Sequence, residues 1–556
     1  MLLGRGRLLP PYGACIMSSS MESHCLSFRE IPHTTKLFLT FLEDFSRVQR
    51  YFAHLPTEAG VAAAAREIKL DAQVRSGVVE VLREQNLAFG ADSATMQNLD
   101  RLAQGAAAIV TGQQVGLFSG PAFSLYKGIS AARVAEEVTR SGTQAVPIFW
   151  LATEDHDIAE INHVSWNTSQ GLAEFALPEI EAEAGRRVGE IKLGAAIAPL
   201  VAKAAASLEG SFAEEMARAL RESYTPEETY GSAFGKLMAR LLAGRGVILL
   251  DPLDARLHRL SAAVYRRALD EADHLRDALV ARSKELDRGG FHAQVKVTGG
   301  STLLFYNVEG RRQPLRSRNG KFLAGSKLFS LEELRAAIEK TPEAFTPNVL
   351  LRPVVQDTLL PTAAYIGGPA EIAYMAQAQV VYTKILGRMP AILPRASFTI
   401  VESRVARLLA KYGLQVTDVL RGRQRLRARM EQKSLPRTLA RRFEADEKAL
   451  RRLIKAYRNP LKKLDRTLVG ALDSAERKML HQLLKLKSKA GRAENLRTGV
   501  LDRHERILLD ALYPHRGLQE RSLSPVPWLA AYGPALLDDL ARLIKPACRD
   551  HQILFL

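Results

Sequence analysis

The chain has 556 residues, of which 47% are hydrophobic and 25% are charged. At about 150 residues per domain, this length predicts three or four structural units that share or divide a substantial core. The composition is too apolar for a disordered protein, and no apolar run reaches the roughly 18 residues that a membrane-spanning helix needs. We therefore exclude both of these classes and expect no membrane partner.

The three cysteines, Cys15, Cys25 and Cys548, are too few for a disulfide framework. This usage is typical of a reducing compartment, and we expect a cytoplasmic protein.

The N-terminal residues 1–25 are expected to be a disordered, dispensable leader. Its two prolines, Pro10 and Pro11, leave the apolar part too short for a signal peptide. Because helical sequence begins only near residue 34, Met17 or Met21 is a candidate for the true start.

The positive charge is concentrated in residues 401–500, which hold 27 Lys and Arg against 10 Asp and Glu. Nearly all of the net charge of +18 therefore lies in about a fifth of the chain. Basic blocks can bind nucleic acid. Here the block coincides with long helical sequence, so a solvated helical face or a dimer interface is the favoured interpretation.

The spacing of apolar residues predicts helices over residues 26–104 and an α/β core over residues 105–400. In the core, a strand at 106–110, a glycine-rich loop at 111–120, a helix to about 140 and a strand at 145–152 form a βαβ unit. Such alternation predicts a parallel sheet. Further strands are expected at 246–252, 360–369 and 391–401, with a helix over 370–386.

Two inserts are expected in this core, at about 165–240 and 285–325. The second has short alternating runs and the turn Asn319-Gly320, which predicts a small antiparallel β module. Residues 401–512 are expected to form a helical coiled coil broken at Pro436 and Pro460. Residues 513–556 are expected to be a helical segment that packs on the core.

Two loops share one pattern, Ser119-Gly120-Pro121 and Gly367-Gly368-Pro369. Each follows a predicted strand and opens a helix, whose first N–H groups and partial positive charge suit an anion. Neither loop matches a Walker motif or Gly-x-Gly-x-x-Gly. Turn chemistry explains each loop alone, but the pair at one sheet predicts a nucleotide or carboxylate site.

The densest polar cluster is Thr153-Glu-Asp-His-Asp157, and Glu160, Asn162 and His163 follow it. Three interpretations remain open. His156, Glu160 and His163 have helical spacing that suits a metal, although no further ligand pair is evident. Asp155 or Asp157 would cap the next helix. The favoured interpretation is acid–base chemistry and the binding of a substrate ammonium group.

Other polar residues near the expected strand ends are less distinctive, and each alone is more often structural than catalytic. They are Gln113, Gln114 and Lys127 around the first loop, Arg352, Gln356 and Asp357 before the second, and Arg395 and Ser397 at a later strand.

Five long segments resemble the bacillithiol-biosynthesis cysteine-adding enzymes, in the right order over residues 30–556. They are TGQQVGLFSGPAFSLYKGISAARVA, PIFWLATEDHDIAEINHV, NVLLRPVVQDTLLPTAAYIGGPAEIAYMAQ, ILPRASFTIVE and LYPHRGLQER. The resemblance implies a Rossmann-like core similar to class I aminoacyl-tRNA synthetases and a coiled coil that forms a homodimer. It also implies a ligase that joins cysteine to glucosaminyl malate through an amide, the last step of bacillithiol biosynthesis.

The resemblance and the residue patterns together assign roles. The catalytic candidates are Asp155, His156 and Asp157. The substrate-binding candidates are Gln113, Gln114, Glu154, Asn162, His163, Gln356, Asp357 and Glu371. The candidates for binding ATP or ADP are Gly116, Ser119, Gly120, Lys127, Gly367, Gly368, Arg395 and Ser397. No metal is predicted, and the family implies a possible second ADP-like site near the coiled coil.

The implied mechanism needs an activated cysteine carboxyl, because a carboxylate does not form an amide at neutral pH. ATP would supply a cysteinyl adenylate or phosphate, with helix N-termini and Lys127 or Arg395 on the phosphates. One of Asp155, His156 and Asp157 would then deprotonate the glucosamine amine.

Two other classes remain as alternatives. A synthetase-like RNA-binding protein would use the basic helical block, but that block has few aromatic residues for base stacking. A coiled-coil scaffold with an inert core would leave the polar strand ends unexplained.

Overall fold

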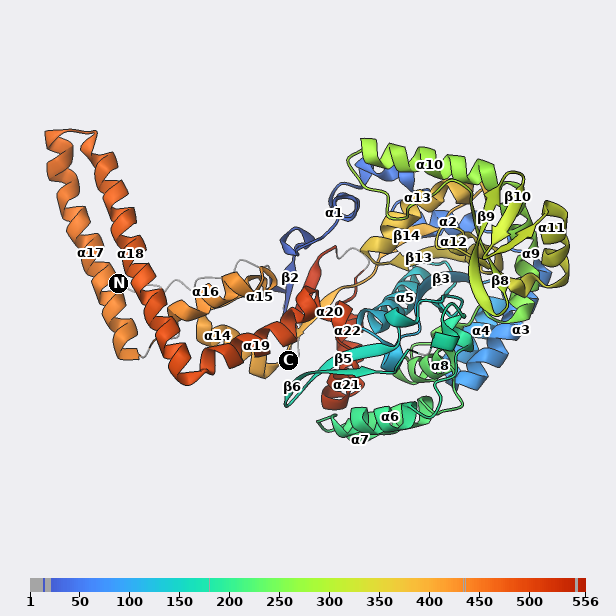
Figure 1. Ribbon diagram of the computed structural model, residues 1–556, viewed down its shortest axis with the longest axis horizontal. Helices are drawn as coiled ribbons and strands as arrows, with labels where there is room; N and C mark the ends of the chain where they lie inside the picture. Colours follow the sequence, from blue (N-terminus) through green and yellow to red (C-terminus); the bar gives the residue numbers. More distant parts are fainter. Residues whose placement is uncertain (1–13, 16–21, 180, 434, 436, 546–548) are drawn as a thin grey trace.

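The computed structural model describes residues 14–15, 22–179, 181–433, 435, 437–545 and 549–556. It has a large α/β body from which a long helical hairpin projects, as Figure 1 shows. In the described part of the chain, no helix is both long and apolar enough to cross a lipid bilayer.

The centre of the body is a five-stranded parallel sheet with the strand order β14-β13-β3-β4-β7. The chain enters at β3, adds β4 and β7 on one side, and returns to add β13 and β14 on the other. This order is that of a Rossmann-like sheet, whose direction of winding reverses between β3 and β13. The strands are β3 Ala107–Gln113, β4 Ala145–Leu151, β7 Ile248–Leu250, β13 Thr362–Gly367 and β14 Ala391–Pro394.

Both faces of this sheet are covered by helices, which explains why its strands are nearly continuous apolar runs. Alternate residues of β3 point to opposite faces: Ile109 packs with α2 and α5, whereas Val110 joins the cluster on the other face. That second face is covered by α3, α4, α12 and α13. These helices are α2 Glu58–Arg66, α3 Ala72–Phe89, α4 Ser93–Ala103, α5 Phe123–Arg140, α12 Arg352–Leu359 and α13 Pro369–Ile385.

The first insert follows β4 and is a two-stranded hairpin with three helices. The second is a five-stranded antiparallel sheet with the order β11-β10-β9-β8-β12. Asn319 and Gly320 have φ values of +51° and +72°, as the predicted two-residue hairpin turn requires. The elements are β5 His163–Thr168, β6 Gly171–Ala176, α6 Ile197–Ala206, α7 Ala213–Ser223, α8 Tyr230–Leu241, β8 Ser301–Val308, β9 Arg311–Arg318, β10 Lys321–Ala324, β11 Lys327–Phe329 and β12 Phe345–Pro347.

The bounds expected for this second insert, 285–325, were too narrow at one end and too wide at the other. Helix α10 continues to Arg288, and the sheet extends through β11 to β12, which pairs with β8. Gly289-Gly290, with Gly290 at a φ of +74°, is a local signal for the end of α10, whereas the far limit is set by the pairing of β12 with β8, which is distant in the sequence. The helices beside the insert are α9 Ala255–Asp270, α10 Ala272–Arg288 and α11 Leu331–Lys340.

The predicted strand at 391–401 is two strands in two sheets. β14 ends at Pro394, and β15 pairs in parallel with β16, which pairs antiparallel with β2. The expectation of a disordered leader is therefore wrong for residues 22–25, which belong to β2; Ala14–Cys15 is also a short strand. The remaining leader residues lie outside the described part, as does Cys548. These strands are β15 Phe398–Val401, β16 His551–Phe555 and β2 Glu22–Leu26, and α1 is Lys36–Glu43.

The C-terminal part is mainly helical and contains the projecting hairpin of α17 and α18 (Figure 1). The break expected at Pro460 is absent, because this proline lies inside α17. The Ala456 carbonyl that it leaves without a helical donor is at an exposed position, where water can satisfy it. Pro436 lies outside the described residues. The helices are α14 Ser403–Tyr412, α15 Val416–Leu420, α16 Arg423–Lys433, α17 Arg437–Leu464, α18 Leu468–Thr498, α19 Val500–Leu512, α20 Gln519–Ser522, α21 Val526–Tyr532 and α22 Ala535–Leu543.

The predicted C-terminal helical segment consists of short helices and ends in a strand. Helix α22 packs on α5, and β16 completes the small sheet that holds β2 and β15. The segment therefore joins the two ends of the chain to the body.

Candidate active site

A pocket of about 630 Å³ opens at the carboxyl ends of β3, β4 and β13. This is where the winding of the sheet reverses, which is the usual ligand position in such folds. Three segments that are far apart in the sequence line it: residues 112–114 at the end of β3, 154–156 after β4, and 368–371 at the start of α13. The second predicted glycine loop and the acidic cluster thus meet at one cavity, together with the end of β3.

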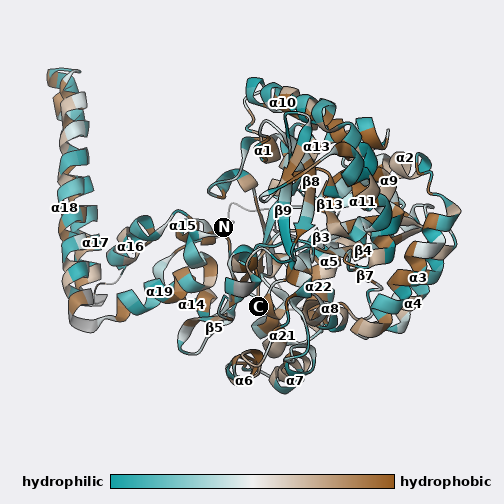
Figure 2. Cartoon of the chain, turned by 45° about the vertical axis from the view of Figure 1, so that its right-hand side comes forward, coloured by the Kyte–Doolittle hydropathy of each residue, from teal (hydrophilic) through white to brown (hydrophobic). Residues whose placement is uncertain are grey.

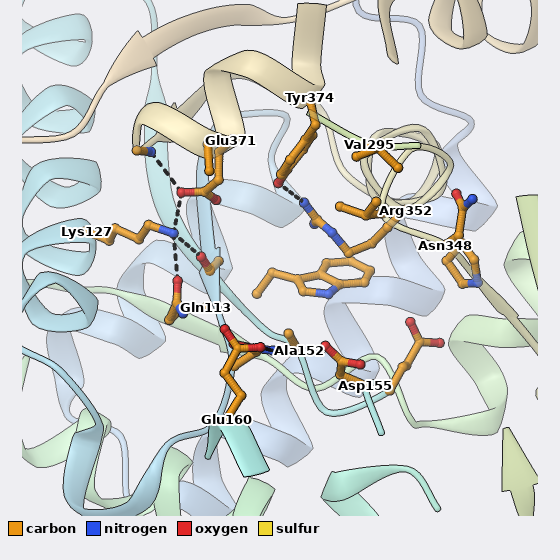
Figure 3. A pocket seen from close by; sticks show the side chains of 18 of the residues that line it. Gln113, Lys127, Ala152, Asp155, Glu160, Val295, Asn348, Arg352, Glu371 and Tyr374 are labelled. Carbon is orange, nitrogen blue, oxygen red and sulfur yellow. Dashed lines mark hydrogen bonds and ion pairs between the residues drawn. The ribbon is translucent and has the colours of Figure 1, made fainter. Parts of the chain in front are cut away.

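Lys127 lies in this pocket but its charge is already paired. Its Nζ is 2.5 Å from a carboxylate oxygen of Glu371, and it donates to the Gly112 carbonyl at 2.7 Å and to Gln113 Oε1 at 2.9 Å (Figure 3). Burial lowers the pKa of Lys127 to about 8, although Glu371 opposes this shift. Lys127 therefore ties α5 to the ends of β3 and α13.

Glu371 is fixed at the first turn of α13. It accepts hydrogen bonds from the Gly368 backbone N–H at 2.8 Å and from the Tyr365 hydroxyl at 2.6 Å. Burial alone would raise the pKa of Glu371, but Lys127 and the Gly368 N–H outweigh burial and hold the pKa below its usual value. An ionised carboxylate at a helix N-terminus is favourable, so Glu371 orders this wall of the pocket.

Asp155, His156 and Arg312 form a connected group on the opposite wall. Arg312, from β9, donates to His156 Nδ1 at 3.0 Å, and its Nη1 is 3.7 Å from Asp155 Oδ1. Asp155 also accepts from Gln114 at 3.0 Å. Burial would raise the pKa of Asp155, but His156, Arg312 and Gln114 together hold it well below its usual range.

The contact with Arg312 determines the state of the His156 ring. Arg312 can only donate, so Nδ1 must present its lone pair and the neutral ring carries its proton on Nε2. The contact between His156 Nδ1 and Asp155 is longer, at 3.5 Å, and lies outside the usual distance range of a hydrogen bond. Figure 3 shows Asp155 and Glu160 on the side of the pocket opposite Arg352 and Tyr374.

Glu154 lies deeper in the same wall and is only 6% exposed. Among the described residues its nearest charged or basic neighbour is His258, whose Nε2 is 3.6 Å from Oε1. Burial raises the pKa of Glu154 to about 7, and burial lowers the pKa of His258 to about 4. Both groups are therefore uncharged over a range of mildly acidic pH.

Arginines dominate the remaining wall. Arg395 donates to Glu520 at 2.7 Å, and Arg352 donates to the Tyr374 hydroxyl at 3.0 Å. Arg521 is an exposed residue whose guanidinium lies over the Phe123 ring at 5.6 Å. Within the described chain neither Arg521 nor Arg352 forms an ion pair with a carboxylate, and Arg521 is the more exposed of the two, so it is the more accessible to an anion.

The first glycine loop does not line this pocket, contrary to the assignment of Gly116, Ser119 and Gly120 to nucleotide binding. A Cβ on Gly116 would lie 2.9 Å from the Gly120 Cα, and Gly120 has a φ of +63°. Ser119 is buried, and its N–H donates to the Tyr224 hydroxyl at 3.3 Å. The glycines serve a tight turn whose side chains enter the hydrophobic core.

Three residues around the acidic cluster also lie outside the pocket. Asp157 and His163 are exposed, and the Asn162 side chain donates to the Leu177 carbonyl at 3.0 Å. The alternative of a helical metal site is not supported, because residues 158–160 are a short 3₁₀ turn and His163 begins β5. In the described part of the chain no group of three metal-ligating side chains is present. Asp157 makes no side-chain capping bond.

Four further predicted site residues lie behind the pocket wall and do not line the pocket. Gln356 donates to Asp357 at 2.9 Å, and both are buried beneath Arg352 and the Tyr382 hydroxyl. Ser397 is buried between Glu520 and His551. Gly367 ends β13, and its neighbour Gly368 reaches the pocket. These residues support the lining rather than form it.

Comparison with known proteins gives the family of the chain. The family model "Bacillithiol biosynthesis BshC, N-terminal Rossmann-like domain" matches residues 21–396, and "Bacillithiol biosynthesis BshC, C-terminal coiled-coil domain" matches residues 398–556. The chain belongs to the BshC family. The boundary between the two matches falls between β14 and β15, where the chain leaves the parallel sheet.

Similar proteins carry one shared name, "Putative cysteine ligase BshC". The protein from Koribacter versatilis is 41% identical over 96% of this chain and all of its own length. The protein from Solibacter usitatus is 37% identical with the same coverage, and that from Salinibacter ruber is 32% identical over 93% of this chain and 95% of its own. The comparisons lend no support to the RNA-binding alternative, and the likeness to aminoacyl-tRNA synthetases stays a prediction.

Several residues that line the BshC pocket here were not singled out from the sequence. Arg312 and Phe305 come from the antiparallel insert, and Trp150 comes from the buried strand β4. Arg521 and Asn348 lie in two of the segments that carry the family resemblance. That membership was a usable signal for these two and for Trp150, which lies in the segment PIFWLATEDHDIAEINHV, whereas no local pattern marks Arg312 and Phe305.

Proposed function

We propose that this chain is a ligase that joins the carboxyl group of L-cysteine to the amino group of glucosaminyl malate, the last step of bacillithiol biosynthesis. The single observation that carries this proposal is one pocket with an acidic wall facing a cationic wall at the reversal point of a Rossmann-like sheet. Membership of the BshC family and the ligase name of the relatives agree with it.

The two walls suit the two kinds of substrate group. Glu154, Asp155 and Glu160 lie on the wall that would receive ammonium groups. The opposite wall offers Arg521 and the first N–H groups of α13, which suit carboxylates or phosphates. An amino acid and a malate-bearing amino sugar carry both kinds of charge, so both can be oriented in such a pocket.

We infer that the reaction consumes a nucleoside triphosphate, because a free carboxylate is unreactive toward amines at neutral pH. Lys127 and Arg395 are already paired with carboxylates, and the Gly116–Gly120 turn is outside the pocket. A phosphate would therefore meet the α13 N-terminus and Arg521. We also propose a second site for ATP or ADP near the coiled coil, which the family resemblance supports.

A homodimer through the helical hairpin is the assembly we propose. Large apolar side chains are exposed along α17 and α18, including Leu453 at 56%, Leu464 at 80% and Leu486 at 57%. Figure 2 shows that hydrophilic residues dominate this hairpin between such positions. Pairing of two hairpins would cover these side chains.

The ligase proposal is tested with purified protein, cysteine and glucosaminyl malate in the presence of ATP, ADP or no nucleotide. We expect mass spectrometry to detect the cysteinyl amide with ATP and little without it. The control is Glu174→Gln, at an exposed position on β6 outside the pocket, which is expected to retain wild-type turnover. Absence of the amide under every nucleotide condition would contradict the proposal.

A further inference from the structure

Glu154 differs from the other carboxylates of the pocket. Asp155 accepts hydrogen bonds from Gln114 and from a backbone N–H, Glu160 accepts from Gln114 at 2.6 Å, and Glu371 pairs with Lys127. The Glu154 carboxyl accepts no hydrogen bond from any described residue, and the nearest basic nitrogen among them is His258 Nε2 at 3.6 Å. A carboxyl that is 6% exposed and lacks hydrogen bonds is costly.

The surroundings of Glu154 indicate where a hydrogen-bond donor to its carboxyl would come from. It faces the pocket, and the indole Nε1 of Trp150, which also lines the pocket, is buried without a partner in the described chain. The charged and titratable groups that face Glu154 come from five elements or their ends: Arg312, Arg187, Asp251, Arg352, His258 and Tyr265. None of them donates a hydrogen bond to its carboxyl, so the missing donor is expected from a ligand.

Of the three residues that the sequence favoured as bases, Asp157 lies outside the pocket, and Asp155 and His156 are already engaged by their neighbours. Asp155 is held ionised by its neighbours, and its low pKa makes it a weak proton acceptor at neutral pH. His156 presents the lone pair of Nδ1 to Arg312. Glu154, by contrast, has a pKa raised to about 7 by burial and exchanges its proton near neutral pH.

We propose that Glu154 binds the primary amino group of the acceptor substrate and accepts a proton from it. The inference rests on the ligase function proposed above. One N–H bond of the ammonium breaks and an O–H bond forms on Glu154. The freed lone pair then attacks the cysteine carbonyl carbon, activated as an acyl phosphate or acyl adenylate by a nucleoside triphosphate. The C–N bond forms, the C–O bond breaks, the phosphate or nucleotide oxygen leaves with the electron pair, and the second amine proton passes to solvent.

The experiment compares two nucleophiles in the full-length protein. The amino group of glucosaminyl malate is protonated at neutral pH and must lose a proton to a base before it can attack. Hydroxylamine is largely unprotonated at this pH and needs no base. We expect Glu154→Gln to reduce kcat/KM for glucosaminyl malate about 100-fold or more, the usual contribution of a general base. Cysteine hydroxamate formation should stay within about threefold of wild type, since that step would not use the base.

Two further variants complete the comparison. Glu154→Asp keeps a carboxyl but withdraws it by one methylene, and it should fall between wild type and Glu154→Gln. Glu174→Gln should match wild type with both nucleophiles. The wild-type pH profile for glucosaminyl malate should show a limb near pH 7 that Glu154→Gln lacks.

The outcomes separate this inference from the ligase function itself. Equal losses with both nucleophiles in Glu154→Gln and Glu154→Asp would mean a structural role and would overturn the inference, as would no loss with glucosaminyl malate. A wild-type protein that forms neither product would overturn the ligase function instead.

Discussion

Replacing Glu154 by glutamine should change how the stability of the protein depends on pH. In the folded state the pKa of Glu154 is about 7, against 4.5 for the free side chain. A raised carboxyl pKa means that the folded state holds this proton more tightly than the unfolded state. The wild-type side chain therefore contributes stability below about pH 4.5 and loses that contribution as the pH rises through 7.

The size of this effect follows from the pKa difference. A shift of about 2.5 units corresponds to about 3 kcal/mol at 1.36 kcal/mol per unit. Glutamine cannot ionise, so the free energy of unfolding of Glu154→Gln relative to wild type should rise by about 3 kcal/mol between pH 4.5 and pH 8. His258 titrates in the opposite sense, with stability gained as the pH rises from 4 to 6.5. Both proteins keep His258, but it lies 3.6 Å from Glu154, so the part of its contribution that depends on Glu154 remains in the difference.

The assay is urea unfolding of both proteins at a series of pH values, followed by circular dichroism and tryptophan fluorescence. Coincident transitions from the two probes would justify a two-state analysis. The same difference in unfolding free energy at pH 5 and pH 8 would refute the view that Glu154 is a buried carboxyl with a raised pKa.

Three further predictions concern the charged lining. Lys127→Met leaves the buried Glu371 carboxylate uncompensated and should lower the free energy of unfolding by about 3–5 kcal/mol. Addition of Glu371→Gln should recover part of this loss in urea titrations, and simple additivity would contradict the pairing. Arg312→Leu removes the hydrogen bond to His156 and should lower kcat about tenfold or more, as expected for the loss of a charged hydrogen bond. An unchanged kcat in steady-state kinetics would contradict this role of Arg312. Arg521→Ala should raise the KM of an anionic substrate about tenfold without changing the melting temperature, and an unchanged KM for every substrate would exclude Arg521 from binding.

The parallel sheet was predictable because its signals are local. Strands β3 and β4 are short apolar runs, and both strands are almost wholly buried. The helix after Pro121 links them. The convergence of the site was also predictable, since the carboxyl ends of parallel strands share one edge. Residues at or just after the ends of these strands, such as Gln113, Glu154 and Gly368, are therefore found in one pocket.

The parts that could not be predicted depend on contacts between distant segments. Arg312 reaches His156 from another sheet, 156 residues along the chain. Strand β2, near the N-terminus, pairs with β16, which lies near the C-terminus. The Gly116–Gly120 loop has the composition of a binding loop, but its glycines meet a steric need inside a tight turn. No local pattern separates these cases from their alternatives.

The most direct test of the central claim is a crystal structure of the protein with cysteine, glucosaminyl malate and a non-hydrolysable nucleoside triphosphate analogue. We expect the acceptor amine within hydrogen-bond distance of Glu154 and the anionic groups at Arg521 and the start of α13. Both substrates bound elsewhere on the molecule, with this pocket empty at saturating concentrations, would contradict the account.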